Sequence, residues 1–302
     1  MAGRDSNGSA PPVRADQRDA SANEIVRALI ASGLVGELRL DAETTAGRLG
    51  DFVGAARQAG RPVTVMGRLA FEELPAEEPH ERWVAEGDGS QAAWRLAYER
   101  PPRWQRLIKR GLDLVLAPVL LVLLSPVLLT IAVAIKLSTP GPVFYRWRVL
   151  GKDGRPFVGY KFRTMVQGAD ELKATLLPHN RMVGPVFKMA GDPRITPLGR
   201  WLRRYSLDEL PQLWSVLRGD MSLVGPRPVF PKEYGQFELW QMRKLSIVPG
   251  ITCLWQVNGR NTIADFDEWV RLDLDYIDRW SLGLDLRILW QTLSAVVRGT
   301  GQ

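Results

Sequence analysis

The alternation of apolar and polar positions divides the amino-terminal third of the chain into segments of different character. Residues 1–23 offer almost nothing for a core to bury, so we expect a disordered tail. Residues 24–70 combine helical apolar spacing with short alternating runs, which predicts a partial α/β unit with strands near 38–40 and 63–66. Residues 71–102 begin with an acidic stretch, which we interpret as a solvated linker.

An uncharged apolar run from Leu114 to Ile135 predicts a membrane helix within residues 103–140. At about 1.5 Å per residue it could cross a hydrocarbon core of about 30 Å. Proline at position 126 favours a bend in the middle, and basic residues flank both ends of the run. We therefore favour a re-entrant helix that returns to the side it entered, with a plain spanning helix as the alternative. Asp113, near the entry, is expected to pair with Lys109 or Arg110.

Residues 141–302 are predicted to form a small α/β catalytic domain. Apolar and basic residues alternate on both sides of Lys152–Gly154, which is typical of a β-hairpin. The second strand would present Lys161 and Arg163 on one face, where both could contact one diphosphate. An exposed basic strand is the alternative.

Further along the chain, Asp208 and Glu209 form a carboxylate pair beside a row of arginines at positions 200, 203 and 204. Ser206 with Glu209 three residues later has the pattern of a capping box, which would place Asp208 in the first turn of a helix. Free backbone N–H groups there would also bind a phosphate, and Asp208 could then act as a nucleophile. The alternative is that both carboxylates only complement the helix dipole. Pro211 predicts an irregular first turn.

Glycine and proline positions predict rigid turns around several further charged residues. Arg227 lies between two prolines, which suits a side chain that holds phosphate with a planar, bidentate grip, although a turn with a solvated arginine is the alternative. Asp192 and Arg194 are weaker site candidates. Helices are expected over residues 168–180 and 284–297, the latter lying along a membrane or packed in the core, and a short apolar strand between turns at 249–252 and 258–260.

Composition narrows the choice of function. The chain has 302 residues and a formal net charge of +7, which indicates anionic partners: nucleic acid, acidic lipid or nucleotide phosphates. Its one cysteine excludes an internal disulfide and a cysteine-based zinc site, and its two histidines, about a hundred residues apart, argue against histidine chemistry. No apolar run opens the chain, so we expect its start to stay in the cytoplasm.

Three separate segments resemble the bacterial sugar transferase family, the monotopic phosphoglycosyl transferases that begin lipid-linked glycan assembly. They are residues 206–228 (SLDELPQLWSVLRGDMSLVGPRP), 161–165 (KFRTM) and 249–260 (PGITCLWQVNGR). The resemblance runs from about Arg103 to the carboxyl terminus. It implies an α+β, membrane-associated fold with a re-entrant helix, a small catalytic domain and amphipathic interfacial helices. The unit at 24–70 resembles half of the nucleotide-binding-like domain that longer members carry.

The resemblance implies transfer of a sugar-1-phosphate from a UDP-sugar to polyprenyl (undecaprenyl) phosphate with release of UMP, as a first step of exopolysaccharide or related glycan assembly. Asp208 would be the nucleophile, Glu209 the ligand of Mg²⁺, and Lys161 a third catalytic residue. Substrate-binding roles are expected for Arg163, Arg200, Arg204, Asp220, Arg227 and Arg260. The implied location is the cytoplasmic face of the bacterial inner membrane, and a homodimer is left open.

Two other classes fit parts of the sequence. A catalytically silent basic membrane scaffold would need the carboxylates only for capping. A nucleic-acid binder would fit the net charge, and its affinity would fall steeply with salt. Neither accounts for the carboxylate pair, the arginine between prolines and the apolar run together, so we expect no nucleic-acid partner.

Overall fold

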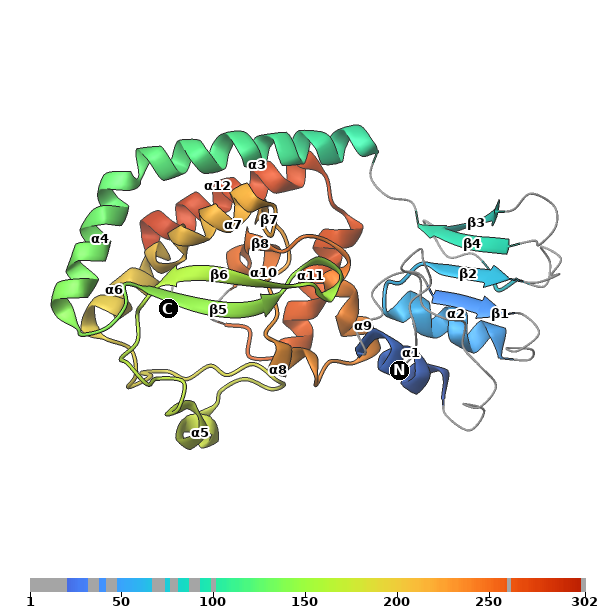
Figure 1. The fold of residues 1–302 in the computed structure, drawn as a ribbon, viewed down its shortest axis with the longest axis horizontal. Helices are drawn as coiled ribbons and strands as arrows, with labels where there is room; N and C mark the ends of the chain where they lie inside the picture. The colour runs from blue at the N-terminus through green and yellow to red at the C-terminus, as the bar shows by residue number, and fades with distance from the viewer. Residues whose placement is uncertain are drawn as a thin grey trace. The chain divides into compact units, whose positions relative to one another are not determined.

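The computed structural model describes residues 21–31, 38–41, 48–66, 74–76, 81–86, 93–98, 102–259 and 262–299. It forms two compact units: residues 1–100 with 237–246, and residues 101–236 with 247–302. Figure 1 shows the elements of both. The predictions for residues 1–20 and for Arg260 lie outside the described residues.

The first unit is a small mixed sheet with helices. In the sheet, with strand order β1-β2-β4-β3, β1 and β2 are parallel and the other neighbours are antiparallel. Its core is built from apolar residues of both helices and of the strands, as the alternation predicted. The elements are α1 (Ala22–Ala31), β1 (Leu38–Asp41), α2 (Leu49–Gln58), β2 (Val63–Met66), β3 (Glu81–Glu86) and β4 (Ala93–Tyr98).

Strands β3 and β4 correct the prediction of a solvated linker over residues 71–102. They pair along their whole length, with Trp83 opposite Leu96, and both of these side chains are buried. The acidic residues at the start of this stretch favoured a linker, but the apolar side chains of Trp83 and Leu96 further along are what the strands bury.

A segment from the carboxyl-terminal half belongs to the same first unit. It contains α9 (Leu239–Met242) and η6 (Arg243–Ser246), and its Phe237 is fully buried. Gly60 lies so close to it that a Cβ there would be 2.5 Å from Arg243 Cγ. These residues were predicted to belong to the catalytic domain.

The second unit begins with two helices, α3 (Arg103–Leu123) and α4 (Ser125–Ser138), whose axes differ by 59°. The bend follows from Pro126, which has no N–H to donate and stands at the start of α4, while Ser125 Oγ donates to Val122 O at 2.7 Å. The predicted bend is therefore confirmed. Within the described residues, no single helix has the length and apolar composition to cross a membrane; only the bent pair passes together.

Asp113 on α3 does not pair with Lys109 or Arg110, so that prediction was wrong. Its Oδ1 accepts hydrogen bonds from Ser222 Oγ at 3.1 Å and from the Leu223 N–H at 2.9 Å. The carboxylate is 5% exposed. Asp113 thus attaches α3 to strand β7 (Ser222–Val224), because a buried carboxylate needs donors and a backbone N–H supplies one.

Lys109 makes the second attachment of α3. Its Nζ lies 2.6 Å from Asp285 Oδ2 on α12 (Leu282–Arg298) and also donates to Val224 O. Tyr276 donates its hydroxyl to Asp285 Oδ1 at 2.7 Å. Burial, and then the charge of Asp285, raise the pKa of Tyr276 well above its ordinary value, so the phenol stays protonated.

The rest of the second unit packs short helices against two small sheets (Figure 1). β5 (Phe144–Leu150) and β6 (Pro156–Phe162) form the predicted hairpin, and β7 pairs in parallel with β8 (Gly250–Thr252). Helix α3 packs on α7 and α12 through one apolar cluster, and α4 packs on β6 and α6 through another. The remaining elements are η3 (Lys152–Gly154), α5 (Lys173–Leu176), η4 (Leu177–His179), α6 (Pro197–Arg204), η5 (Leu207–Gln212), α7 (Leu213–Arg218), α8 (Pro231–Tyr234), α10 (Leu254–Val257) and α11 (Phe266–Asp278).

Two predicted elements differ from the structure. The helix expected over 168–180 is reduced to α5 and η4 after a series of turns. The strand expected after residues 249–252 is the helix α10, and 250–252 itself is the strand. Short apolar runs do not distinguish a strand from one turn of helix, so neighbouring backbone decides. The helix predicted over 284–297 is confirmed as α12.

Candidate active site

The β5–β6 hairpin brings Lys161 and Trp147 together. Lys161 lies opposite Tyr145, and Gly159 lies opposite Trp147, so all four residues share one face of the ladder. Lys161 Nζ is 4.3 Å from the centre of the Trp147 ring, close enough for a cation–π contact. The indole therefore fixes the direction of the ammonium group.

Gly159 is required for this arrangement. A Cβ at that position would lie 2.3 Å from Trp147 Nε1, well inside the contact limit. The missing side chain leaves room for the indole to lie across the neighbouring strand beneath Lys161.

Asp208 and Glu209 are held on η5, a 3₁₀ segment packed against β6. Ser206 precedes it with φ 54°, in the left-handed region, and its side chain makes no capping hydrogen bond. The predicted capping box is thus wrong, because Ser206 adopts the left-handed backbone conformation in place of the extended one that is typical of an N-cap residue. The predicted irregular turn is confirmed, with Pro211 inside the 3₁₀ segment.

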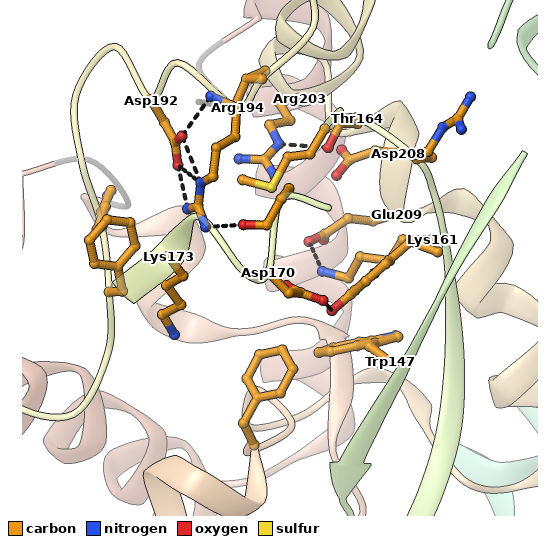
Figure 2. Close-up of a pocket in the computed structure, with 18 of the residues that line it drawn as sticks. Trp147, Lys161, Thr164, Asp170, Lys173, Asp192, Arg194, Arg203, Asp208 and Glu209 are labelled. Carbon is orange, nitrogen blue, oxygen red and sulfur yellow. Dashed lines mark hydrogen bonds and ion pairs between the residues drawn. The ribbon is translucent and has the colours of Figure 1, made fainter. Parts of the chain in front are cut away.

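Asp208, Glu209 and Lys161 line one cavity of about 580 Å³, within the ordinary size of a small-molecule site. Glu209 Oε1 lies 2.8 Å from Lys161 Nζ, which confirms that Lys161 lies near the carboxylates. Asp208 is 8% exposed and faces the same space (Figure 2). A carboxylate in this position can approach a ligand while cations surround it.

Arg203 lines the same cavity, and the charges of Asp208 and Glu209 act on its guanidinium (Figure 2). It donates Nε–H to Thr164 Oγ1 at 2.9 Å. Burial lowers the pKa of Arg203, and the charges of Asp208, Asp192 and Glu209 oppose that shift. The guanidinium stays charged, because arginine does not lose its proton in proteins.

Asp192 and Arg194 lie on the same cavity wall but bind one another (Figure 2). Arg194 Nη2 is 2.6 Å from Asp192 Oδ2, and its Nη1 donates to Ala169 O. The hydrogen bonds from Arg194 lower the pKa of Asp192 below its ordinary value. This pair shapes the wall of the cavity.

The loop that carries Arg227 is held by the short β7–β8 sheet. Gly225 donates its N–H to Thr252 O, and Gly250 donates to Pro226 O. The backbones approach so closely that a Cβ at Gly250 would lie 2.0 Å from Gly225 N. Arg227 lines the cavity, as the rigid loop between prolines predicted.

The structure places other predicted residues away from the carboxylates. Arg200 and Arg204 are exposed and do not line the cavity, and Asp220 pairs with Arg218 at the end of α7. Arg163 borders the cavity but donates to the carbonyl oxygens of Thr139 and Pro140. Those carbonyls follow the end of α4, so Arg163 joins the helix pair to the hairpin.

Trp147, Thr164 and Gln212 line the cavity and were not singled out from the sequence. The sequence could have identified Trp147, because it lies two residues after Tyr145 and therefore on the strand face that pairs with Lys161. Thr164 and Gln212 had none, because their roles depend on packing between distant segments.

The carboxylates suit Mg²⁺ only together with a substrate. Among the described residues no group of three or more His, Cys, Asp or Glu side chains could hold a metal ion. Magnesium commonly takes one or two carboxylates plus substrate phosphates and water. Asp208 and Glu209 meet that pattern, although Glu209 would have to share its contact with Lys161.

The part of the chain that is similar to known proteins coincides closely with the second unit. A family model described as "Bacterial sugar transferase" matches residues 104–299. The chain is 50% identical over 161 residues to "Galactosyl transferase CpsE" of Streptococcus agalactiae, covering 53% of this chain and 36% of that protein. It is 42% identical over 195 residues to "UDP-glucose:undecaprenyl-phosphate glucose-1-phosphate transferase" of Escherichia coli, covering 62% and 40%.

A third relative is only slightly longer than the segment that aligns with this chain. "Exopolysaccharide production protein ExoY" of Rhizobium meliloti is 40% identical over 199 residues, covering 65% of this chain and 88% of that protein. The chain spans less than half the length of the two longer relatives. The residues matched by the family model include those that line the cavity described above.

Proposed function

The chain belongs to the bacterial sugar transferase family, and on this premise we propose that it transfers a sugar-1-phosphate from a UDP-sugar to undecaprenyl phosphate or another polyprenyl phosphate. The names of several relatives support this, since they refer to undecaprenyl phosphate, to glucose or galactose, and to exopolysaccharide. The observation that carries the proposal is Asp208, buried at a cavity beside Arg203 and the Glu209–Lys161 ion pair.

Asp208 acts as the nucleophile in two displacements at one phosphorus. First, a carboxylate oxygen of Asp208 bonds to the phosphorus that bears the sugar, and the bond from that phosphorus to the bridging oxygen breaks. UMP leaves with the electron pair. A phosphate oxygen of the polyprenyl acceptor then attacks the same phosphorus, and the bond to Asp208 breaks to restore the carboxylate.

The cations around Asp208 make this attack feasible. A carboxylate is repelled by a charged diphosphate unless positive groups offset that charge in the transition state. Arg203 lies beside Asp208, and Lys161 is held in direction by Trp147 and Glu209. Mg²⁺ bound by Glu209 and the donor would draw further charge from the diphosphate.

The bent pair α3–α4 accounts for access to a lipid acceptor. Large apolar side chains along both helices are exposed, among them Leu107, Val122, Leu129 and Leu137. A re-entrant pair that enters one leaflet and returns would place these side chains in lipid and the cavity at the interface, on the cytoplasmic face of the inner membrane. Helix α12 adds an exposed apolar stripe of Leu286, Trp290, Leu293 and Val297, typical of a helix lying in the interface.

The test is release of UMP by detergent-solubilised protein given a panel of UDP-sugars, Mg²⁺ and polyprenyl phosphate, with Asp208→Asn as the comparison. We expect release with at least one sugar and a loss of at least about 10³-fold in the variant. With the acceptor withheld, intact-mass analysis should find a phosphosugar adduct on the wild type and none on the variant. Equal release by Asp208→Asn would refute the mechanism and favour a scaffold whose carboxylates only complete the fold.

A further inference from the structure

Asp170 is a carboxylate of the cavity that the transfer mechanism leaves unused. It lies on the segment between β6 and α5 and lines the same cavity as Asp208. Its side chain is exposed, and Figure 2 shows the carboxylate directed into the cavity. A ligand that fills the cavity can therefore reach it.

Tyr145 holds Asp170 beside the reacting groups. Its hydroxyl donates to Asp170 Oδ2 at 3.3 Å, which is longer than the usual O–H···O distance of about 2.7–2.8 Å. Burial, and then the charge of Asp170, raise the pKa of Tyr145, so the phenol stays protonated and remains the donor. Tyr145 lies directly opposite Lys161 in the β5–β6 ladder, and Lys161 contacts Glu209. Asp170 is thus about one strand spacing from the groups that surround Asp208.

The carboxylate of Asp170 can accept further hydrogen bonds. Among the described residues it makes no other side-chain hydrogen bond and no ion pair, and an ionised carboxylate offers about four acceptor sites. Asp192, on the same cavity wall, is already bound by Arg194. Glu233 accepts from the N–H of Phe230 and is 8% exposed. Asp170 is therefore an accessible acceptor that the fold itself does not occupy.

The charges of the cavity restrict what Asp170 can bind. A carboxylate repels phosphate and binds groups that donate hydrogen bonds, whereas lysine and arginine only donate and suit phosphate. Of the parts of a UDP-sugar, the sugar carries hydroxyl donors next to the attacked phosphorus, and the ribose lies beyond the second phosphate. The cations that line the cavity are Lys161, Arg163, Lys173, Lys188, Arg194, Arg203 and Arg227.

On the basis of the proposed function, we propose that Asp170 accepts hydrogen bonds from hydroxyl groups of the sugar in the UDP-sugar donor. The sugar is attached to the phosphorus that Asp208 attacks, so it occupies the part of the cavity next to Lys161. Hydroxyls on neighbouring sugar carbons can share the two oxygens of one carboxylate. Asp170 thus holds the sugar during the attack and contributes to the choice of sugar.

The test compares Asp170→Ala with Glu171→Ala, each in the full chain that also carries Asp208→Asn to prevent turnover. Glu171 is the matched control, because it is exposed, lines the same wall and carries the same charge. Calorimetry on the detergent-solubilised protein, without acceptor, measures the dissociation constants of UDP-glucose, UDP-galactose and UDP. UDP has the nucleoside and both phosphates but no sugar.

Charge and hydrogen bonding predict opposite signs in this comparison. Removing a carboxylate that only lines the cavity reduces repulsion of the diphosphate, so all three ligands should bind equally well or more tightly. We expect this result for Glu171→Ala. For Asp170→Ala we expect at least one UDP-sugar to bind roughly tenfold more weakly, as for loss of one hydrogen bond to a charged group, while the affinity for UDP is unchanged or higher.

Three results would overturn the proposal. The first is unchanged or tighter binding of both UDP-sugars by Asp170→Ala. The second is an equal weakening of UDP, because the carboxylate would then hold the ribose. The third is an equal loss in Glu171→Ala, because the effect would then not belong to Asp170. Binding is measured without turnover, so a failure of UMP release with Asp208 intact is a separate result that concerns the proposed function.

Discussion

Replacing Asp113 by alanine should destabilise the second unit more than any exposed carboxylate does. The side chain is 5% exposed and accepts from Ser222 Oγ and from the Leu223 N–H. Each hydrogen bond to a buried charge contributes about 1.5–3 kcal/mol, and the abandoned backbone N–H cannot reach water. The expected loss in free energy of unfolding is therefore about 3–5 kcal/mol.

A thermal melt of the detergent-solubilised protein measures this loss. For a unit of this size, about 1 kcal/mol shifts Tm by about 2–4 °C, so Asp113→Ala should lower Tm by at least about 6 °C. Asp113→Asn keeps one oxygen for the Leu223 N–H and should cost less than half as much. Scans at one rate keep the comparison valid if unfolding is irreversible.

Asp275→Ala is the matched control. Asp275 pairs with Arg279 four residues later on the surface of α11, and an exposed pair of this kind contributes about 0–1 kcal/mol. A Tm for Asp113→Ala no lower than that of Asp275→Ala would refute the reasoning. It would mean that α3 is held by its apolar contacts alone.

Two further predictions concern packing and pH. Gly199→Ala should lower Tm although alanine favours helices, because its Cβ would lie 2.1 Å from Thr164 O. Gly111→Ala on α3 should be neutral or stabilising by up to about 1 kcal/mol, because no atom lies within 4 Å of its Cβ. A lower Tm for Gly111→Ala than for Gly199→Ala would contradict this. The lowered pKa of Asp192 stabilises the fold above its unfolded pKa of about 3.9, and this contribution is lost as pH falls through the folded value. Melts from pH 7 to 2 should therefore show Asp192→Asn less stable than wild type at pH 7 and less sensitive to acid; parallel curves would contradict this.

Local patterns predicted the parts of the structure that depend on local backbone. The hairpin around Lys152–Gly154 follows from alternation and a turn that needs positive φ, and both Asp153 and Gly154 have it. The bend near Pro126 follows from a missing N–H. These features need no information from distant parts of the chain.

The sequence alone does not show which of the three arginines of α6 faces the cavity. Successive residues on a helix point about 100° apart, and the side that faces inward is fixed by packing. Leu202 and Gly199 pack against the hairpin side, and this rotation points Arg203 to the cavity while Arg200 and Arg204 stay exposed. The partner of Asp113 was equally hidden, because β7 lies more than 100 residues further along.

Tryptophans 255 and 269 show a different limit. Both were visible as aromatic residues in the carboxyl-terminal third, where core packing and an interfacial role were the available interpretations. Their stacking and the absence of partners for their N–H groups among the described residues are properties of the folded chain alone. A sequence shows which side chains have donors, but only the structure shows whether those donors are satisfied.

The bend between α3 and α4 helps to position both walls of the cavity that holds Asp208. Helix α3 attaches to β7 through Asp113, next to the loop that carries Arg227. Beyond the bend, Ile131 and Ile135 of α4 pack against Phe162 and Leu202, neighbours in sequence of Lys161 and Arg203. A straight helix continuing from α3 could not reach this second cluster. The break at Pro126 therefore lets one apolar segment pack against both walls of the cavity.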